Sequence, residues 1–353
     1  MKVLGIESSC DECAAAVVED GRKVLSSVVQ SQIPFYAAYN GVVPEIASRK
    51  HIEWIQDVVA EALRKANPGN ERQSCNGCRG VDAVAVSYRP GLLGALLVGL
   101  NFAKAFAWAG GLPFIAVDHM LAHLYASRLD VESAQPAVDY PFLGLLVSGG
   151  HSIICRADNF DDITVLGATI DDAAGEAFDK VSKHYGFGYP GGAVIDRLAK
   201  SGNPGAYNFP MPNLHKSGNN MDFSYSGLKT AVIHQLNQFR AGNGENNAPN
   251  DADIAASFQK TAVEILLRGL LNAVKFTGIK TIVAGGGVAA NSLLRSGLAG
   301  HADLRCVFPP LEFCGDNGAM VAGIGYCYLA RGETSPLAIT ASARSPGFKR
   351  LRQ

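Results

Sequence analysis

The stretch KVLGIESSCDECAAAVV, residues 2–18, decides the fold, because two short apolar runs in it enclose a polar turn. The runs 2–6 and 14–18 predict two strands separated by the turn 7–12. Residues 22–29 suit a third strand. The chain is therefore expected to open with three consecutive strands joined by short connections.

A second segment repeats this order after an acidic, proline-containing break at 130–140. It predicts a strand at 142–147, a polar turn at 148–152 and a returning strand at 153–156. Two halves that open alike suggest an internal structural duplication.

Helical patterns and further strands lie between and after these hairpins. The spacing of apolar residues predicts helices at 44–67, 92–108 and 255–276, and strands at 81–86 and 281–284. Mixed strands and crossover helices indicate an α/β class. A length of 353 residues suits two domains of about 150 residues each.

The net charge of −1 excludes attraction of a polyanion by the whole surface, so a nucleic acid would need a local basic patch. The basic tail is one candidate, although a solvated terminus explains it equally simply: Arg344, Lys349, Arg350 and Arg352.

Residues 1–20 do not resemble a secretory signal, and the apolar run 90–103 is too short to span a bilayer. These features predict a soluble, cytoplasmic protein. Eight cysteines suggest reduced thiols. The pairs Cys10/Cys13 and Cys75/Cys78 have zinc-ligand spacing, but nothing in the sequence brings them together.

His119 and His123 lie four residues apart, a spacing that lets two imidazoles on one helical face share a metal ion. A metalloprotease helix carries a glutamate directly after the first histidine, and here that residue is Met120. A partly buried helix without metal is the alternative. Asp316 could complete a ligand set typical of divalent iron or zinc, but sequence distance does not show that it reaches the histidines.

Three polar turns after strands have the chemistry of nucleotide binding: 8–12, 148–152 and 285–291. No Walker or GxGxxG motif follows a strand, which argues against a P-loop or Rossmann site. In the acidic segment 170–180, Asp171 and Asp172 suit a helix N-terminus, whereas Asp179 could accept hydrogen bonds from a ribose.

With these residues in view, the chain closely resembles the tRNA N6-adenosine threonylcarbamoyltransferase family in its bacterial or organellar form. The matching motifs run in order from residue 5 to about residue 320: GIESSCDE (5–12), GVVPEIASR (41–49), PGL (90–92), GALLVG (94–99), His119 with His123, LVSGGH (146–151), IDDAAGEAFDK (170–180), FSYSGLKTA (223–231), GGGVAAN (285–291) and Asp316-Asn317.

The resemblance implies an actin-like, sugar-kinase-like fold, a duplicated ribonuclease-H-like α/β architecture with two domains around a nucleotide cleft. The expected domains are 1–135, 136–317 and a C-terminal helix and tail at 318–353, with the helix packing back on the first domain. The implied reaction transfers threonylcarbamoyl from threonylcarbamoyl-AMP to the N6 amine of the adenosine following the anticodon, in tRNAs reading ANN codons.

By position, the resemblance gives His119, His123 and Asp316 the role of ligands to one divalent metal per subunit, usually Fe2+, with Zn2+ as the alternative. Asp11 and Glu12 match acidic residues near the reacting centre, the expected catalytic pair. The adenylate-binding roles fall on Leu146, Val147, Ser148, Gly149, Gly150, Asp179, Gly192, Asp196 and Asn291.

The implied partners are tRNA, an inactive paralogue of the same fold and a P-loop ATPase, with no membrane, in the cytoplasm or, in a eukaryote, an organellar matrix. Three positions depart from the family pattern: Arg89 replaces a usual glycine, Cys13 a threonine and Gly315 often a threonine. An ATPase or sugar kinase of the same fold, a metallopeptidase and a nucleotide-binding scaffold are the competing hypotheses.

Overall fold

The computed structural model describes residues 1–36, 39, 41–68, 80–130, 138–212, 214, 221–241, 250–345 and 348–350, and the chain divides into two compact units. The first unit comprises Met1–Val138 and Pro309–Phe348, and the second comprises Asp139–Phe308 and Lys349–Gln353. The return to the first unit thus begins at Pro309, ahead of the expected boundary at 318. The turn before the last helix belongs with that helix because the Asn317 amide donates to the carbonyl oxygens of Phe313 and Gly315.

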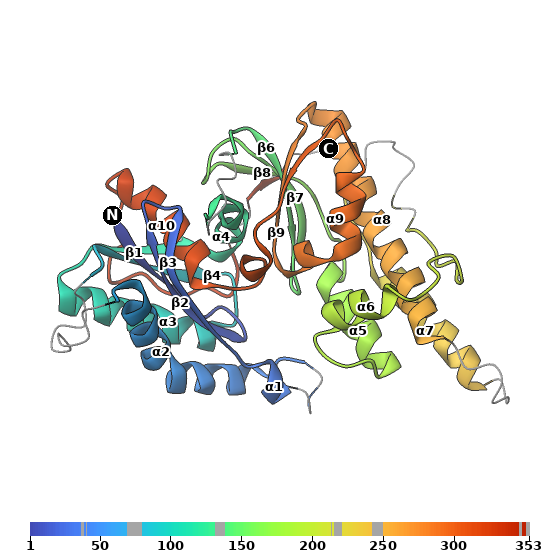
Figure 1. Cartoon of the computed structure of the whole chain (residues 1–353), viewed down its shortest axis with the longest axis horizontal. Helices are drawn as coiled ribbons and strands as arrows, with labels where there is room; N and C mark the ends of the chain where they lie inside the picture. The colour runs from blue at the N-terminus through green and yellow to red at the C-terminus, as the bar shows by residue number, and fades with distance from the viewer. Residues whose placement is uncertain are drawn as a thin grey trace. The chain divides into compact units, whose positions relative to one another are not determined.

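The first unit contains a five-stranded sheet in the order β3-β2-β1-β4-β5 (Figure 1). Its strands are β1 (Lys2–Glu7), β2 (Glu12–Glu19), β3 (Lys23–Ser31), β4 (Ala83–Arg89) and β5 (Phe114–Asp118). β1, β2 and β3 pair antiparallel, whereas β4 pairs parallel with β1 and β5 parallel with β4. The predicted opening of three consecutive strands is confirmed.

In this unit α2 and α3 cover one face of the sheet and α10 covers the other. The helices described are α1 (Ile33–Tyr36), α2 (Pro44–Ala66), α3 (Leu93–Gly110), α4 (His119–Tyr125) and α10 (Gly318–Ala330). Leu4 and Ile6 join the core formed with α2 and α3. Gly5 points to the opposite face, where a Cβ would lie 2.1 Å from the Gly318 carbonyl oxygen. That contact requires glycine at residue 5 and holds the start of α10 against β1.

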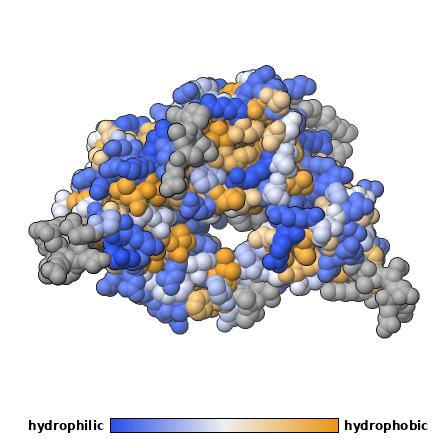
Figure 2. Space-filling model, viewed as in Figure 1, coloured by the Kyte–Doolittle hydropathy of each residue, from blue (hydrophilic) through white to orange (hydrophobic). Residues whose placement is uncertain are grey.

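Among the described helices, α3 is long and apolar enough to cross a membrane by length and composition. In this structure it covers the sheet, with Leu96, Leu100 and Ala103 fully buried. Its outer residues Leu93 and Trp108 are exposed. On the face drawn in Figure 2, hydrophobic residues reach the surface in separate groups among hydrophilic ones.

The second unit contains a six-stranded sheet in the order β10-β9-β6-β7-β8-β11. Its strands are β6 (Phe142–Val147), β7 (Ser152–Ala157), β8 (Ile163–Ala168), β9 (Thr281–Gly285), β10 (Arg305–Val307) and β11 (Lys349–Arg350). β6, β7 and β8 pair antiparallel, whereas β9 pairs parallel with β6 and β10 parallel with β9. The first five strands therefore repeat the order and directions of the first sheet, which confirms the duplication inferred from the hairpins.

The helices of the second unit are α5 (Ala174–Tyr185), α6 (Gly191–Ala199), α7 (Ser226–Ala241), α8 (Asp251–Thr277) and α9 (Ser292–Ala299). Phe178 of α5 and Phe258 of α8 stack edge to face, with ring centroids 5.0 Å apart, in the core of the unit. This core fixes α5, α6 and α9, which carry or adjoin the predicted site residues Asp179, Asp196 and Asn291.

The end of the basic tail forms a strand where the structure describes it, although its side chains are exposed. Lys349 and Arg350 form β11, which pairs parallel with β8. The Arg350 guanidinium donates to both oxygens of Asp222, at 2.8 and 3.0 Å. Arg352 lies outside the described residues.

Candidate metal centre

The two histidines lie on a short helix that follows directly from a strand, and His119 is its first residue. Asp118 ends β5 and caps α4, because its side chain accepts a hydrogen bond from the Met120 amide at 3.0 Å. His119 and His123 lie one turn apart, with ring centroids 4.5 Å apart and planes at 78°. Both side chains are buried. The predicted projection from one helical face is confirmed.

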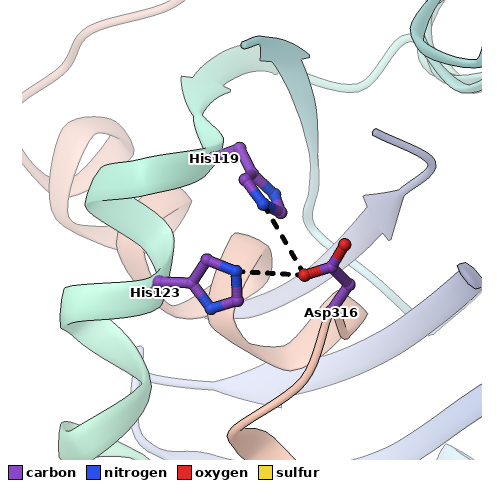
Figure 3. Close-up of side chains that lie close together, drawn as sticks. All are labelled: His119, His123 and Asp316. Atoms are coloured by element: carbon purple, nitrogen blue, oxygen red, sulfur yellow. Dashed lines mark hydrogen bonds and ion pairs between the residues drawn. The ribbon is translucent and has the colours of Figure 1, made fainter. Parts of the chain in front are cut away.

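Asp316 reaches the histidines because it lies just before α10, whose first residue, Gly318, packs closely on Gly5 of β1. Asn317 caps α10 by accepting a hydrogen bond from the Met320 amide at 2.9 Å. Asp316 Oδ1 lies 3.0 Å from His123 Nε2 and 3.6 Å from His119 Nε2 (Figure 3). One potential ligand atom from each of these three residues lies within 4.8 Å of the others, the one such group in the part of the chain described.

The cluster is charged, and its members determine one another's protonation. Burial opposes charge on Asp316, but His119 and His123 hold the pKa of this carboxyl well below its usual range. Burial also opposes charge on His119, yet the carboxylates of Glu7 and Asp316 raise its pKa to about 9. Without metal, a proton on His119 thus lies between two carboxylates.

A divalent cation suits this arrangement, because it would supply positive charge in place of that proton. Two imidazoles and one carboxylate are a common ligand set for Fe2+ or Zn2+ and leave further coordination positions open. The residues present therefore fit a divalent metal ion.

The helix lacks the base that a metallopeptidase of the helical type requires. Met120 follows the first histidine and is 4% exposed, and α4 contains no acidic residue. The zinc alternative for cysteines also gains no support within the described residues. Cys10 and Cys13 are free thiols, and Cys75 and Cys78 lie outside those residues.

Asp11 and Glu12 join the turn after β1 to the start of β2. Burial and the neighbouring Asp11 carboxylate raise the pKa of Glu12 to about 10. Burial also raises the pKa of Asp11, against the hydrogen bond it receives from Glu12. Ser31 donates to Glu12 Oε1 at 3.1 Å. The pair therefore carries a proton at neutral pH.

Two further residues contact the histidine cluster that the sequence did not single out. Glu7 Oε2 lies 2.9 Å from His119 Nδ1. Ser9 Oγ lies 3.3 Å from the same nitrogen and 3.5 Å from Asp316 Oδ2. Their sequence signal is their position where a buried strand ends and a polar turn begins.

In the second unit, two of the predicted nucleotide-binding turns lie together. Leu146 and Val147 are buried in β6, and Ser148 begins the turn to β7. A Cβ on Gly286, in the turn after β9, would lie 2.3 Å from the Val147 carbonyl oxygen. A Cβ on Gly149 or Gly150 would meet nothing within 4 Å. The third turn, 8–12, belongs to the first unit.

The other predicted adenylate-binding residues lie at the N-termini of helices or accept hydrogen bonds from backbone amides there. Asp179 accepts from the Gly191 amide at 2.7 Å, at the start of α6, where a Cβ on Gly192 would meet nothing within 4 Å. Asp196 accepts from the Ser292 amide at 3.0 Å. Asn291 caps α9 and donates to Gln259 Oε1 at 3.2 Å.

Asp171 serves the N-terminus of a helix, because it accepts from the Ser226 amide at 3.3 Å, but that helix is α7 and not the one predicted within 170–180. Asp171 accepts from the Tyr225 amide at 2.8 Å, and Asp172 pairs with Lys180 at 2.8 Å and with Lys229. Asp171 therefore binds the start of α7, and Asp172, which precedes α5, joins α5 to α7 through the two lysines.

Arg89, which departs from the family pattern, contacts the cap of α4. Its Nε donates to Asp118 Oδ2 at 3.2 Å, and its guanidinium lies 4.7 Å from the centre of the Tyr88 ring. Ser345 also donates to Asp118 Oδ2. Nothing in the structure explains Cys13 in place of threonine.

Known proteins of a single family match this chain over most of its length. The family model described as tRNA N6-adenosine threonylcarbamoyltransferase matches residues 23–323. A protein of that name from Treponema denticola is 62% identical over 350 residues, covering 99% of both chains. One from Borrelia hermsii is 48% identical over 349 residues, covering 99% of this chain and 98% of the relative.

Solved structures of low identity support the fold alone. Full-length HypF, in a phosphate- and nucleotide-bound form, has a TM-score of 0.56 at 15% identity and covers 98% of this chain and 47% of its own. Component A of (R)-2-hydroxyglutaryl-CoA dehydratase from Acidaminococcus fermentans has a TM-score of 0.50 at 15% identity, covering 94% and 99%. The duplicated actin-like α/β fold is confirmed.

Proposed function

The chain belongs to the tRNA N6-adenosine threonylcarbamoyltransferase family, and on that premise we propose that its His119, His123 and Asp316 bind the divalent metal ion of the active centre. The enzyme transfers a threonylcarbamoyl group to the N6 amine of adenosine in tRNA. We take the acceptor to be the adenosine following the anticodon in tRNAs that read ANN codons. The donor in this proposal is threonylcarbamoyl-AMP.

One observation supports the metal most strongly: three ligand-type side chains from segments far apart in the sequence converge within 4.8 Å. The carboxylate and the two imidazoles favour Fe2+, with Zn2+ as the alternative. A bound divalent cation would supply Lewis acidity, polarising a carbonyl oxygen or holding an anionic group of the donor. The metallopeptidase alternative lacks its base at Met120.

The donor needs no covalent nucleophile, because an acyl-adenylate is a mixed anhydride that already has a good leaving group. The adenylate is assigned to Leu146–Gly150, Asp179, Gly192, Asp196 and Asn291 of the second unit. The open space at Gly149, Gly150 and Gly192 supports this assignment, since bare backbone can approach a ligand closely. Backbone N–H groups at such a turn stabilise developing negative charge.

Asp11 and Glu12 are the proposed catalytic pair. The amine of adenosine must lose a proton as it acquires the acyl group, and a carboxyl with a raised pKa is a better base at neutral pH. Burial raises the pKa of Asp11, and Glu12 retains its proton. Asp11 would accept the proton, and Glu12 would donate a hydrogen bond to it.

The proposed partners are an inactive paralogue of the same fold and a P-loop ATPase. Apolar side chains exposed on helices of the first unit favour a protein interface there. Ile52 of α2 is 65% exposed and Trp108 of α3 is 76% exposed. Aromatic residues of this kind are enriched at protein interfaces.

The test is nucleoside mass spectrometry after incubation with tRNA, threonylcarbamoyl-AMP and partner proteins, together with metal analysis. His119→Ala should weaken metal binding, so that the dialysed protein retains little metal, and should lower transfer roughly 1,000-fold, because several kcal/mol of transition-state stabilisation would disappear. The matched control is His184→Ala, an exposed histidine of α5, which should retain both. Full transfer by a metal-free His119→Ala protein would disprove the metal role.

A further inference from the structure

Glu7 is a buried carboxylate that the proposed reaction does not use. It is the last residue of β1 and is 0% exposed. Both of its oxygens are engaged: Oε1 accepts from the Ser9 amide at 2.6 Å, and Oε2 lies 2.9 Å from His119 Nδ1. Burying a carboxylate is costly unless it is paired and hydrogen-bonded, so its position calls for a specific partner.

The partner is the outer nitrogen of a proposed metal ligand. His119 Nε2 faces Asp316 Oδ1 at 3.6 Å (Figure 3), whereas Nδ1 faces Glu7. A carboxylate can only accept, so Nδ1 donates its proton to Glu7. The lone pair of the neutral ring is then at Nε2, on the side of Asp316.

The second histidine has no such support. His123 Nδ1 is buried and has no hydrogen-bond partner among the described residues. Its Nε2 contacts Asp316 Oδ1 at 3.0 Å. The two histidines of one helix therefore differ at Nδ1: a carboxylate accepts from this nitrogen in His119, whereas in His123 no described residue engages it.

We infer that Glu7 is a positioning residue that fixes the Nδ1-protonated tautomer of His119 and thereby raises the affinity of the site for a divalent cation. This inference rests on the proposed metal site. Partners in the second coordination shell typically change metal affinity by about 10- to 100-fold.

The isosteric variant Glu7→Gln separates this role from mere packing. An amide has one accepting oxygen and one donating NH2 group. If its oxygen accepts from the Ser9 amide, its NH2 faces His119 Nδ1. That arrangement favours the tautomer with the proton on Nε2. A protonated Nε2 has no lone pair to donate to a metal ion on the side of Asp316. If the amide is reversed, two donors meet at Ser9.

The experiment is a zinc competition titration against a chelator, with zinc as the probe ion, in a double-mutant cycle of Glu7→Gln with His119→Ala. Glu7→Gln alone should weaken zinc binding about 10- to 100-fold. In the His119→Ala background, the same substitution should change affinity less than about 3-fold, because the residue through which it acts is absent. In the His123→Ala background its full effect should persist.

A measurement on the wild-type protein complements the variants. In the zinc-loaded, 15N-labelled protein, His119 should show a protonated Nδ1 and a zinc-bound Nε2. Zinc on Nδ1 would overturn the inference even if Glu7→Gln fails to fold. So would unchanged affinity in a folded Glu7→Gln protein, or an equal loss in the His119→Ala background. A wild-type protein that binds no zinc through His119 would instead refute the proposed metal site itself.

Discussion

The turn between β1 and β2 and the turn between β6 and β7 occupy the same place in two sheets of matching strand order, yet they present different chemistry. In the first, Glu7 and Ser8 are fully buried. In the second, Gly149 and Gly150 are exposed, with open space at each Cα. A duplicated backbone therefore carries the two proposed sites, one built from side chains and one from backbone.

The largest expected effect comes from removing the charged side chain that the first turn faces. Asp316→Ala leaves two imidazoles without a carboxylate, so bound metal should be lost and transfer should fall roughly 1,000-fold or more. Metal analysis after dialysis and a single-turnover assay would measure this. The control is Asp303→Ala, an exposed aspartate at a surface ion pair. Retention of one tightly bound ion by Asp316→Ala would show that the side-chain site is misassigned.

The second expected effect concerns the backbone site. Gly286 has φ +90°, and a Cβ there would lie 2.3 Å from the Val147 carbonyl oxygen. Gly286→Ala should therefore destabilise the second unit by about 3 kcal/mol, measured by denaturant unfolding.

Gly150→Ala is the matched control for this substitution, because its added methyl meets nothing within 4 Å. It should leave the unfolding free energy nearly unchanged and weaken binding of the adenylate donor, seen as a raised KM. Equal destabilisation by both substitutions would contradict the distinction between a closed and an open glycine.

The features that the sequence could predict are those that depend on neighbouring residues. Local patterns found both hairpins, the long helices and the pairing of His119 with His123, because helix and strand periodicities depend on near neighbours. Local patterns could not predict the approach of Asp316, which only the family resemblance implied, since it depends on backbone contact between Gly5 and Gly318, more than 300 residues apart. Such contact leaves no periodic signal.

The same limitation explains the two missed residues, Glu7 and Ser9, and the two misassigned ones, Asp171 and Asp172. Glu7 looked like an ordinary turn residue because its partner, His119, lies on another element. Asp171 and Asp172 looked like helix-start charges because the local sequence allows it, yet tertiary contacts with Tyr225 and Lys229 direct them elsewhere.

The third prediction uses the proton carried by the first turn. Burial raises the pKa of Glu12 to about 10 in the folded protein, against 4.5 as its ordinary value. The folded state then binds more protons than the unfolded state between these values, so Glu12 costs stability increasingly as pH rises from about 4.5 towards 10. Metal-free wild-type protein should therefore lose more thermal stability between pH 5 and 9 than Glu12→Gln does.

Thermal unfolding scans in chelator at several pH values would measure this difference. Glu53→Gln, on the exposed side of α2, is the control and should follow the wild-type curve. Parallel curves for wild-type and Glu12→Gln would mean that Glu12 is ionised in the folded protein and that the first turn does not hold a proton.

The smallest expected effect tests how the start of α4 is supported in this chain. Arg89 is 29% exposed, and its partner Asp118, 4% exposed, also accepts from the Met120 amide and Ser345. Arg89→Gly, which restores the usual family residue, should cost about 1 kcal/mol, between the values for exposed and buried pairs. Arg89→Lys keeps the charge but loses the flat guanidinium over Tyr88, so it should recover only part of this stability.

Zinc affinity should change less than about 3-fold in both variants, because the capping bond of Asp118 remains and Glu7 still orients His119. A loss as large as that expected for Glu7→Gln would show that the cap of α4, rather than the turn after β1, determines the geometry of the first site.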